Sequence, residues 1–155
     1  MTTTTATELT FPLPRTHNTT VHAHLTLSKN HILLHLTTKT PETASQPAML
    51  GSFVYALPPT GNRKDPLSTA IYVRESTLET ATRIAKILAK RTGLPVYVGN
   101  SMSFASAGMG GGVTEEVEGV RGVVEVVCGE VEAWRKGALE GVRMGLWAKR
   151  GGSTS

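Results

Sequence analysis

Alternating apolar and polar residues between positions 20 and 38 predict a β-hairpin. Apolar residues stand at every second position before the Lys29–Asn30 turn, and the same alternation returns after it. Folding the chain at this turn places His24 opposite His35. One face of the hairpin is then almost wholly apolar, and the other carries four of the five histidines. A shift of one residue would bury these histidines, so the pattern specifies the register.

Three further segments have the composition of buried strands, at residues 48–57, 67–74 and 94–99. Proline, glycine and asparagine between the first two predict a turn. Each segment has a tyrosine between apolar neighbours, and these tyrosines are Tyr55, Tyr72 and Tyr97. In a sheet with one solvent-exposed face, each strand should alternate apolar with polar residues. These strands are instead apolar on both faces. The pattern therefore predicts central strands that need cover on both sides.

Two helices are predicted. The clearer one spans residues 76–92, where Ser76 and Glu79 have the spacing of a capping box and Gly93 marks the end. The other spans roughly residues 114–136, where valines recur every three or four positions, with acids at the start and bases at the end. Glycines in this stretch each cost about 1 kcal/mol relative to alanine. We therefore expect this helix to lean on the sheet and its last turns to fray.

Together these elements predict an α+β fold. An antiparallel sheet of about five or six strands would carry both helices on one face. We expect a single domain over residues 17–148, a flexible threonine-rich segment over residues 1–16 and a disordered tail over residues 149–155. Leu9 and Phe11 alternate with polar residues, so an edge strand is the alternative for the first segment.

The apolar second face of the sheet is the most informative feature of the sequence. Two helices can cover only one face, so the other needs a different cover. We favour a partner protein, because tyrosine suits a protein interface, and the interface candidates are Tyr55, Tyr72 and Tyr97. The alternative is that the N-terminal segment or the curl of the sheet covers this face.

Composition narrows the class of protein. The chain has 155 residues, of which 39% are hydrophobic, which suits one domain with a single core. No apolar run approaches the about 20 residues of a membrane-spanning helix. The first residues lack the positive start and apolar block of a secretory signal. Cys128 is the single cysteine, so an internal disulfide is impossible and we expect a reducing compartment.

The net charge of +4 raises the alternative of a basic nucleic-acid-binding module. Bases cluster at Lys86, Lys90 and Arg91 and again near the C-terminus, while residues 115–132 hold six acids. No aromatic residues interleave with the first cluster to form a platform on which bases could stack. We therefore favour solvated helix faces, and we expect no nucleic acid among the partners.

A second alternative is a serine hydrolase that uses Ser101. Residues 99–103, Gly-Asn-Ser-Met-Ser, differ from the nucleophile elbow only at the last position. A triad also needs a histidine and an acid, yet no histidine follows His35 and the only aspartate, Asp65, precedes the serine. We favour the interpretation that a strand simply ends here. The glycine-rich loop at 108–112 matches neither phosphate-binding motif, so no cofactor is expected.

The histidines of the hairpin are candidates for a metal site. His22, His24 and His35 share one predicted face and could bind a metal through their imidazole nitrogens. No carboxylate or thiol is visibly placed to complete the set. A solvated or interface-lining face is therefore favoured, and no metal is predicted.

Three blocks of the sequence resemble the proteasome assembly chaperone 4 family. They are TVHAHLTLSKNHILLHL, DPLSTAIYV and TATRIAKILAKRTGLPVYVGNSM, and together they cover about residues 20–103. Most of the likeness lies in the strand start Pro-Leu-Ser-Thr and in the junction from Ala-Lys-Arg-Thr-Gly to Val-Tyr-Val. The threonine-rich N-terminus, the longer loops at 39–47 and 58–66 and the glycine- and valine-rich C-terminal extension depart from the family pattern.

The resemblance implies a small α+β chaperone without enzymatic activity. It would form a heterodimer, sheet against sheet, with the structurally similar proteasome assembly chaperone 3. The pair would hold a proteasome alpha subunit while the alpha ring of the 20S core particle assembles, in the cytoplasm and also in the nucleus. The residues by themselves predict only a partner, and the proteasome is implied by the resemblance alone.

Overall fold

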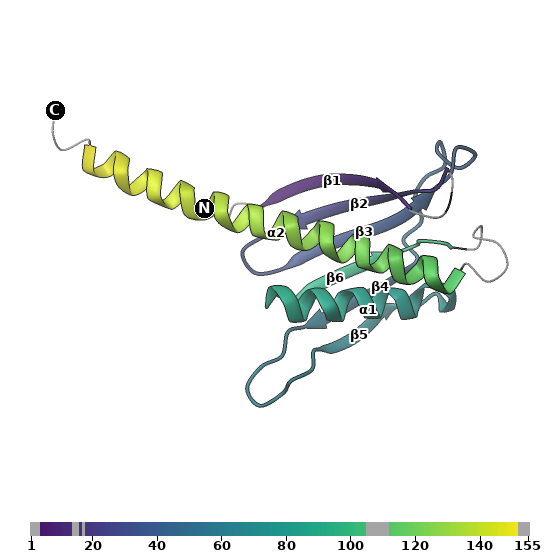
Figure 1. Cartoon of the computed structure of the whole chain (residues 1–155). Helices are drawn as coiled ribbons and strands as arrows, with labels where there is room; N and C mark the ends of the chain where they lie inside the picture. Colours follow the sequence, from purple (N-terminus) through teal and green to yellow (C-terminus); the bar gives the residue numbers. More distant parts are fainter. Residues whose placement is uncertain (1–3, 14–15, 17, 105–111, 152–155) are drawn as a thin grey trace.

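The computed structural model describes residues 4–13, 16, 18–104 and 112–151. Its described part holds one six-stranded sheet and two helices, so the predicted α+β class is confirmed (Figure 1). The elements in chain order are β1 (Thr5–Pro12), β2 (Thr20–Leu27), β3 (Ile32–Lys39), β4 (Ser52–Leu57), β5 (Leu67–Tyr72), α1 (Glu75–Thr92), β6 (Val96–Asn100) and α2 (Gly112–Gly151).

The strand order in the sheet is β1-β2-β3-β6-β4-β5. Every pair is antiparallel except β3 and β6, which run parallel, so the sheet is mixed. The hairpin has the predicted register, with His24 opposite His35. Both helices lie on the same side of the sheet (Figure 1). The opposite side is called the open face from here on.

The N-terminal segment takes the second of its two predicted forms. β1 pairs with β2 along its whole length, from Thr5 opposite Leu27 to Pro12 opposite Thr20. The side chains of Leu9 and Phe11 are partly buried against the core. Residues 5–12 therefore belong to the sheet as an edge strand and not to a flexible terminus. Because β1 extends the sheet sideways, it does not cover the open face.

The core lies between the sheet and the helices. Alternate residues of β2, β3, β4 and β6 point into it, as the period of two along a strand requires. The fully buried apolar residues include Val21, Leu25, Ile32, Leu34, Val54, Ala56, Val96 and Val98 from the sheet and Ile84, Leu88, Val123 and Val127 from the helices. Cys128 is partly buried beside this cluster.

The start of α1 differs from the predicted capping box. The helix begins at Glu75 with Arg74 as its N-cap and without a side-chain cap, so Ser76 and Glu79 form no box. The hydroxyl of Ser52 holds this end instead, accepting a hydrogen bond from the Arg74 N–H and donating one to the Arg74 carbonyl, each at 2.9 Å. Gly93 ends the helix as predicted, in the left-handed conformation with φ of 70°.

The second helix is longer than predicted. It runs to Gly151, beyond the expected end near 136 and into the segment expected to be a disordered tail, of which residues 152–155 lie outside the described part. Two of its glycines allow close packing. A Cβ at Gly119 would lie 2.9 Å from the Phe104 ring, and one at Gly122 would lie 3.2 Å from the Phe11 ring. These glycines therefore let aromatic side chains approach the helix backbone, at a cost in helix propensity.

Candidate protein-interaction surface

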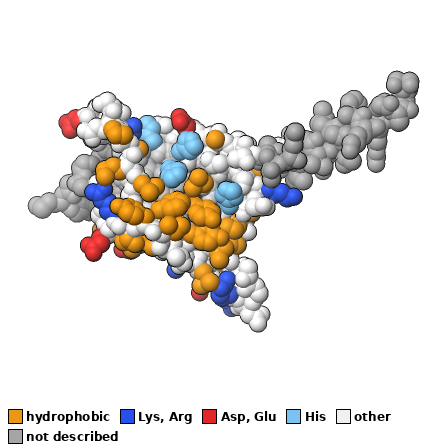
Figure 2. All heavy atoms as spheres, turned by 180° about the vertical axis from the view of Figure 1, so that it is seen from behind, with side chains coloured by type: hydrophobic (Ala, Val, Ile, Leu, Met, Phe, Trp, Pro, Cys, Tyr) orange, Lys and Arg blue, Asp and Glu red, His pale blue; other side chains and the backbone are white. Residues whose placement is uncertain are grey.

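The open face carries an apolar patch at the centre of the sheet. Figure 2 shows this side of the molecule, where hydrophobic side chains gather in one area bordered by histidines. The strands beneath are apolar on both faces because they bury one set of alternate residues in the core and present the other set here. The prediction that the central strands are apolar on both faces of the sheet therefore agrees with the structure.

An aromatic row runs across three strands of this face. We use this name for His35 of β3, Phe53 and Tyr55 of β4 and Tyr97 of β6. The rings of Tyr55 and Tyr97 stack with centroids 4.5 Å apart, and those of Phe53 and Tyr97 lie 6.0 Å apart. The rings of His35 and Phe53 are almost parallel, with an angle of 7° and centroids 6.2 Å apart. Neighbours thus hold each ring in place before any partner binds.

Gly99 makes this arrangement possible. It lies opposite His35 on one side and opposite Phe53 on the other, in the registers of β3 with β6 and β4 with β6. A Cβ at this position would lie 2.6 Å from the Nδ1 atom of His35. A side chain here would therefore push the imidazole away from its stacked position on Phe53.

The three predicted tyrosines share the open face. The structure brings Tyr55 and Tyr97 into contact and places Tyr72 on β5, opposite Phe53 in the register of β4 with β5. Tyr72 is 58% exposed. Sequence reasoning missed Phe53, although it stands two residues before Tyr55 and therefore on the same face of the strand. The exposed large apolar residues near this side are Met49, Leu50, Leu57, Leu67, Ile71 and Val73.

Two ionisable groups of the aromatic row have shifted pKa values. Desolvation raises the pKa of Tyr55 above its usual range, and the neighbouring Tyr97 adds to the effect. Burial lowers the pKa of His35 below 6.5, and the nearby His24 lowers it further. Both shifts favour the neutral form of the group concerned, His35 or Tyr55.

We expect stability to fall on acidification because of His35. Its pKa in the folded chain lies below the unfolded value of 6.5, so the unfolded chain binds the proton more tightly. The His35 contribution is therefore fully present above pH 6.5 and is lost as the pH falls through the folded pKa. Thermal unfolding between about pH 7.5 and 5 measures it. The variant His35→Phe keeps a stacked ring and should show a shallower fall; an unchanged slope would contradict the assignment.

The histidines proposed as metal ligands lie on the open face without a complete ligand set. His24 stands opposite His35, and His22 lies two residues from His24 on the same strand. The Nδ1 atom of His22 lies 3.4 Å from the Thr10 hydroxyl, and that of His31 lies 2.9 Å from the Ser28 hydroxyl. In the described residues, no three His, Cys, Asp or Glu side chains are grouped to hold a metal ion.

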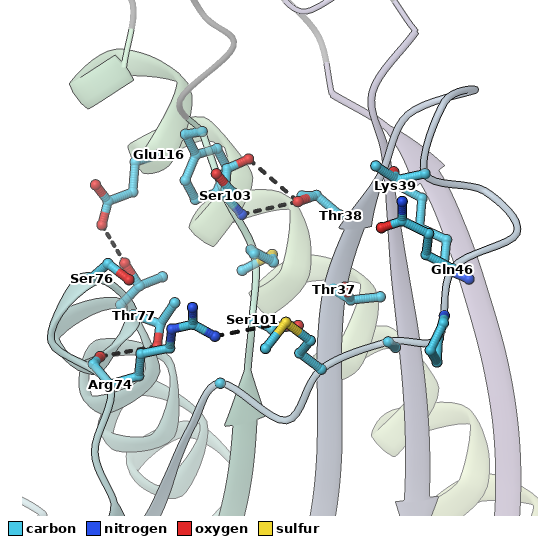
Figure 3. A pocket seen from close by; sticks show the side chains of 18 of the residues that line it. Thr37, Thr38, Lys39, Gln46, Arg74, Ser76, Thr77, Ser101, Ser103 and Glu116 are labelled. Carbon is cyan, nitrogen blue, oxygen red and sulfur yellow. Dashed lines mark hydrogen bonds between the residues drawn. The ribbon is translucent and has the colours of Figure 1, made fainter.

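Ser101 directly follows β6 and contacts the backbone of β3. Its N–H and its hydroxyl both donate to the Leu36 carbonyl, at 2.9 and 3.2 Å. It lines a cavity of about 630 Å³ whose other walls include Arg74 and Glu116 (Figure 3). No histidine is among the described residues that line this cavity. The hydroxyl of Ser101 thus contacts a backbone carbonyl and no histidine in the described residues, and the elbow-like motif lies where β6 ends.

The basic residues proposed for nucleic acid lie on α1, across the sheet from the aromatic row. Lys86, Lys90 and Arg91 are exposed, whereas Arg83 pairs with Glu79 at 2.8 Å. The sheet lies between these charges on α1 and the aromatic side chains of the open face (Figure 1). Those rings therefore form no stacking platform for nucleic-acid bases beside the charges. In the part of the chain that the structure describes, no helix has the length and hydropathy to cross a membrane.

Fold and surface together define a small α+β protein whose two helices lie on one side of the sheet and whose stacked aromatic row lies on the other. The family model described as proteasome assembly chaperone 4 matches residues 20–102, which is more than half of the sequence. The chain therefore belongs to the proteasome assembly chaperone 4 family.

A solved structure supports the fold. The chain is similar to a chain of the yeast structure described as "Crystal Structure of a Novel Chaperone Complex for Yeast 20S Proteasome Assembly", with a TM-score of 0.61 and 16% sequence identity. The similarity covers 83% of this chain and 98% of that chain. No curated protein matches the sequence.

Proposed function

We propose that this chain is a proteasome assembly chaperone that acts as one half of a heterodimer. Its partner would be the homologous proteasome assembly chaperone 3, and the pair would bind a proteasome alpha-type subunit to promote assembly of the 20S alpha ring. The observation that carries the proposal is the uncovered aromatic row on the open face, because both helices lie on the other side of the sheet. Family membership supports the proteasome as the target.

The proposed mechanism is binding without catalysis. The rings of Tyr55 and Tyr97 are already stacked in the free chain, so these two side chains lose little conformational entropy when a partner docks. Tyrosine combines apolar contact with a hydroxyl that can pair at the edge of an interface. Tyr72 on β5 would extend the contact beyond the row. We propose the cytoplasm, and also the nucleus, as the place where the chain acts.

Affinity purification of the tagged full chain from its native cells tests this function. The proposal expects one small homologous chaperone and a proteasome alpha subunit in the eluate, identified by mass spectrometry. Tyr72→Asp should remove the homologous chaperone, because a carboxylate would be desolvated at an apolar contact. The matched control Ala6→Asp lies at the exposed opposite edge of the same sheet and should retain it. Full retention of the partner by Tyr72→Asp would remove this tyrosine from the interface.

A further inference from the structure

A groove lies between the two helices. It has a volume of about 410 Å³, and its walls come from residues 83–91 of α1 and residues 117–125 of α2. No described residue of the sheet lines it, so it opens on the helix side of the molecule, away from the open face. We call it the helix groove.

Hydrogen bonds join the two helices at both ends of the helix groove. Near the start of α1, the hydroxyl of Thr80 donates to the carboxylate of Glu116. At the end of α1, the guanidinium of Arg135 donates to the carbonyl oxygen of Thr92 at 2.6 Å. The order of these contacts shows that α1 and α2 run in the same direction. The walls of the groove are thus held together in the free chain, and a ligand need not order them on docking.

The floor of the helix groove is apolar. Val120 and Val124 are buried there, and Ile87 is half-buried on the α1 side. Val117 is 53% exposed, and Val113, one turn earlier on α2, is 76% exposed. No other large apolar side chain of the helices is as exposed, among those that the structure describes. A ligand that covers Ile87 and Val117 with apolar side chains would therefore remove apolar surface from water, which favours binding.

The rim of the helix groove is positively charged. The guanidiniums of Arg83, Arg91 and Arg121 line the groove, against the single carboxylate of Glu125 among its described residues. Arg83 also pairs with Glu79 at 2.8 Å, but both side chains are exposed, and such a pair contributes little. No ion pair within the described residues involves Arg91 or Arg121. After Glu79, α1 contains four bases and no acid. The groove therefore favours a ligand with acidic groups.

Two other occupants fit these features less well. The bases of α1 in a second copy of this chain would repel the arginines of the groove. From Arg121 to Gly137, the exposed residues of α2 in such a copy include no large apolar side chain to cover Ile87. A nucleic acid would pair with the arginines through its phosphates but would leave Ile87 and Val117 without an apolar partner. No aromatic residue is among the described residues that line the groove, so bases have nothing to stack on.

We infer that the helix groove binds an amphipathic helix of a different protein, with apolar side chains toward Ile87 and Val117 and acidic side chains along both flanks. A groove between two helices accepts the apolar stripe of a third helix. Arg83 and Arg91 stand eight residues apart, about 12 Å along α1, so carboxylates about two turns apart on one flank would reach both guanidiniums. Arg121 would bind the other flank. The groove and the aromatic row lie on opposite sides of the sheet, so the inference goes beyond the proposed heterodimer and does not depend on it (Figure 1).

A displayed library of helical peptides tests the class of ligand. Each peptide spans about five turns and has a fixed apolar stripe, and the positions that flank the stripe vary among glutamate, lysine and glutamine. The library is sorted for binding to the labelled full chain. We expect enrichment of peptides with glutamate on both flanks, because these pair with the guanidiniums of both walls. Enrichment of lysine-rich or uncharged peptides, or no enrichment at all, would overturn the inference.

Charge reversal locates the binding site on the chain. Arg121→Glu should weaken binding of the best acidic peptide at least about tenfold, and the same peptide with lysine in place of glutamate should regain affinity for this variant. The control Lys64→Glu makes the same change in net charge on the loop between β4 and β5, which extends away from the helices, and should keep the wild-type affinity (Figure 1). Fluorescence anisotropy measures each affinity. Equal losses in the two variants, or a matching loss in Tyr97→Asp on the open face, would contradict the inference.

Two further measurements address the other occupants. Single-stranded DNA of about 20 nucleotides should not displace the acidic peptide, and displacement would assign the helix groove to nucleic acid. Sedimentation of the full chain should show no dimer that Arg121→Glu dissociates, and such a dimer would assign the groove to a second copy. Either of these results would overturn the inference, whereas loss of the heterodimer in Tyr97→Asp would leave peptide binding in place.

Discussion

Replacing Tyr97 by aspartate is expected to weaken binding of the homologous chaperone at least about 100-fold, which corresponds to about 3 kcal/mol. Tyr97 stands at the centre of the aromatic row, with Tyr55 4.5 Å and Phe53 6.0 Å from its ring centroid. Aspartate would remove these stacking contacts and place a charge where the partner excludes water. Titration calorimetry with the purified partner measures the loss.

The conservative variant Tyr97→Phe keeps the ring and removes the hydroxyl, so it separates their contributions to the binding affinity. It keeps the stack on Tyr55 and should retain affinity within about tenfold, since one hydrogen bond contributes about 1 kcal/mol. Both variants should keep the wild-type circular dichroism spectrum, because Tyr97 points away from the core. Wild-type affinity in a folded Tyr97→Asp variant would show that the partner does not bind the aromatic row.

Replacing Gly51 by alanine is expected to destabilise the fold by about 3 kcal/mol, a large share of the roughly 5–15 kcal/mol of a typical domain. Gly51 has φ of 66°, which costs an L-residue energy whatever the space around it. A Cβ here would also lie 1.9 Å from the carbonyl oxygen of Asn100. Relief of that overlap must move β4 away from β6, where Ser52 stands opposite Asn100.

A second glycine of this chain provides a matched control. Gly61 has φ of 62°, but nothing lies within 4 Å of a Cβ built there. Gly61→Ala should therefore lower the free energy of unfolding only by the cost of the left-handed conformation, about 1 kcal/mol. Urea unfolding of both variants measures the two free energies. Equal losses would mean that the contact with Asn100 contributes nothing to the cost at Gly51.

Local patterns predicted the parts of the fold that depend on local physics. The hairpin register follows from alternation, because a slip would bury His24 and His35, and the structure has that register. Gly93 ends α1 as its position after the helix predicts. The start of α1 was predicted wrongly because Ser52, a residue distant in the sequence, holds it. A contact between distant segments leaves no mark on the spacing of Ser76 and Glu79.

Long-range arrangement explains the other differences. The position of β6 between β3 and β4 is set by packing across the whole sheet and not by any neighbouring residue. The glycines of α2 are unfavourable for an isolated helix, yet Gly119 and Gly122 accommodate the rings of Phe104 and Phe11. The candidate surface was predicted through its tyrosines. Phe53 was missed, although its position two residues before Tyr55 assigns it to the same face.

The position of β6 has a consequence for biosynthesis. The last strand to leave the ribosome is an inner strand, with β3 on one side and β4 on the other. Until residues 96–100 emerge, the β1-β2-β3 unit and the β4-β5 hairpin have no strand to join them, and each exposes an apolar edge. The nascent chain therefore keeps two unpaired strand edges until this late point, and such edges make a folding intermediate prone to aggregation.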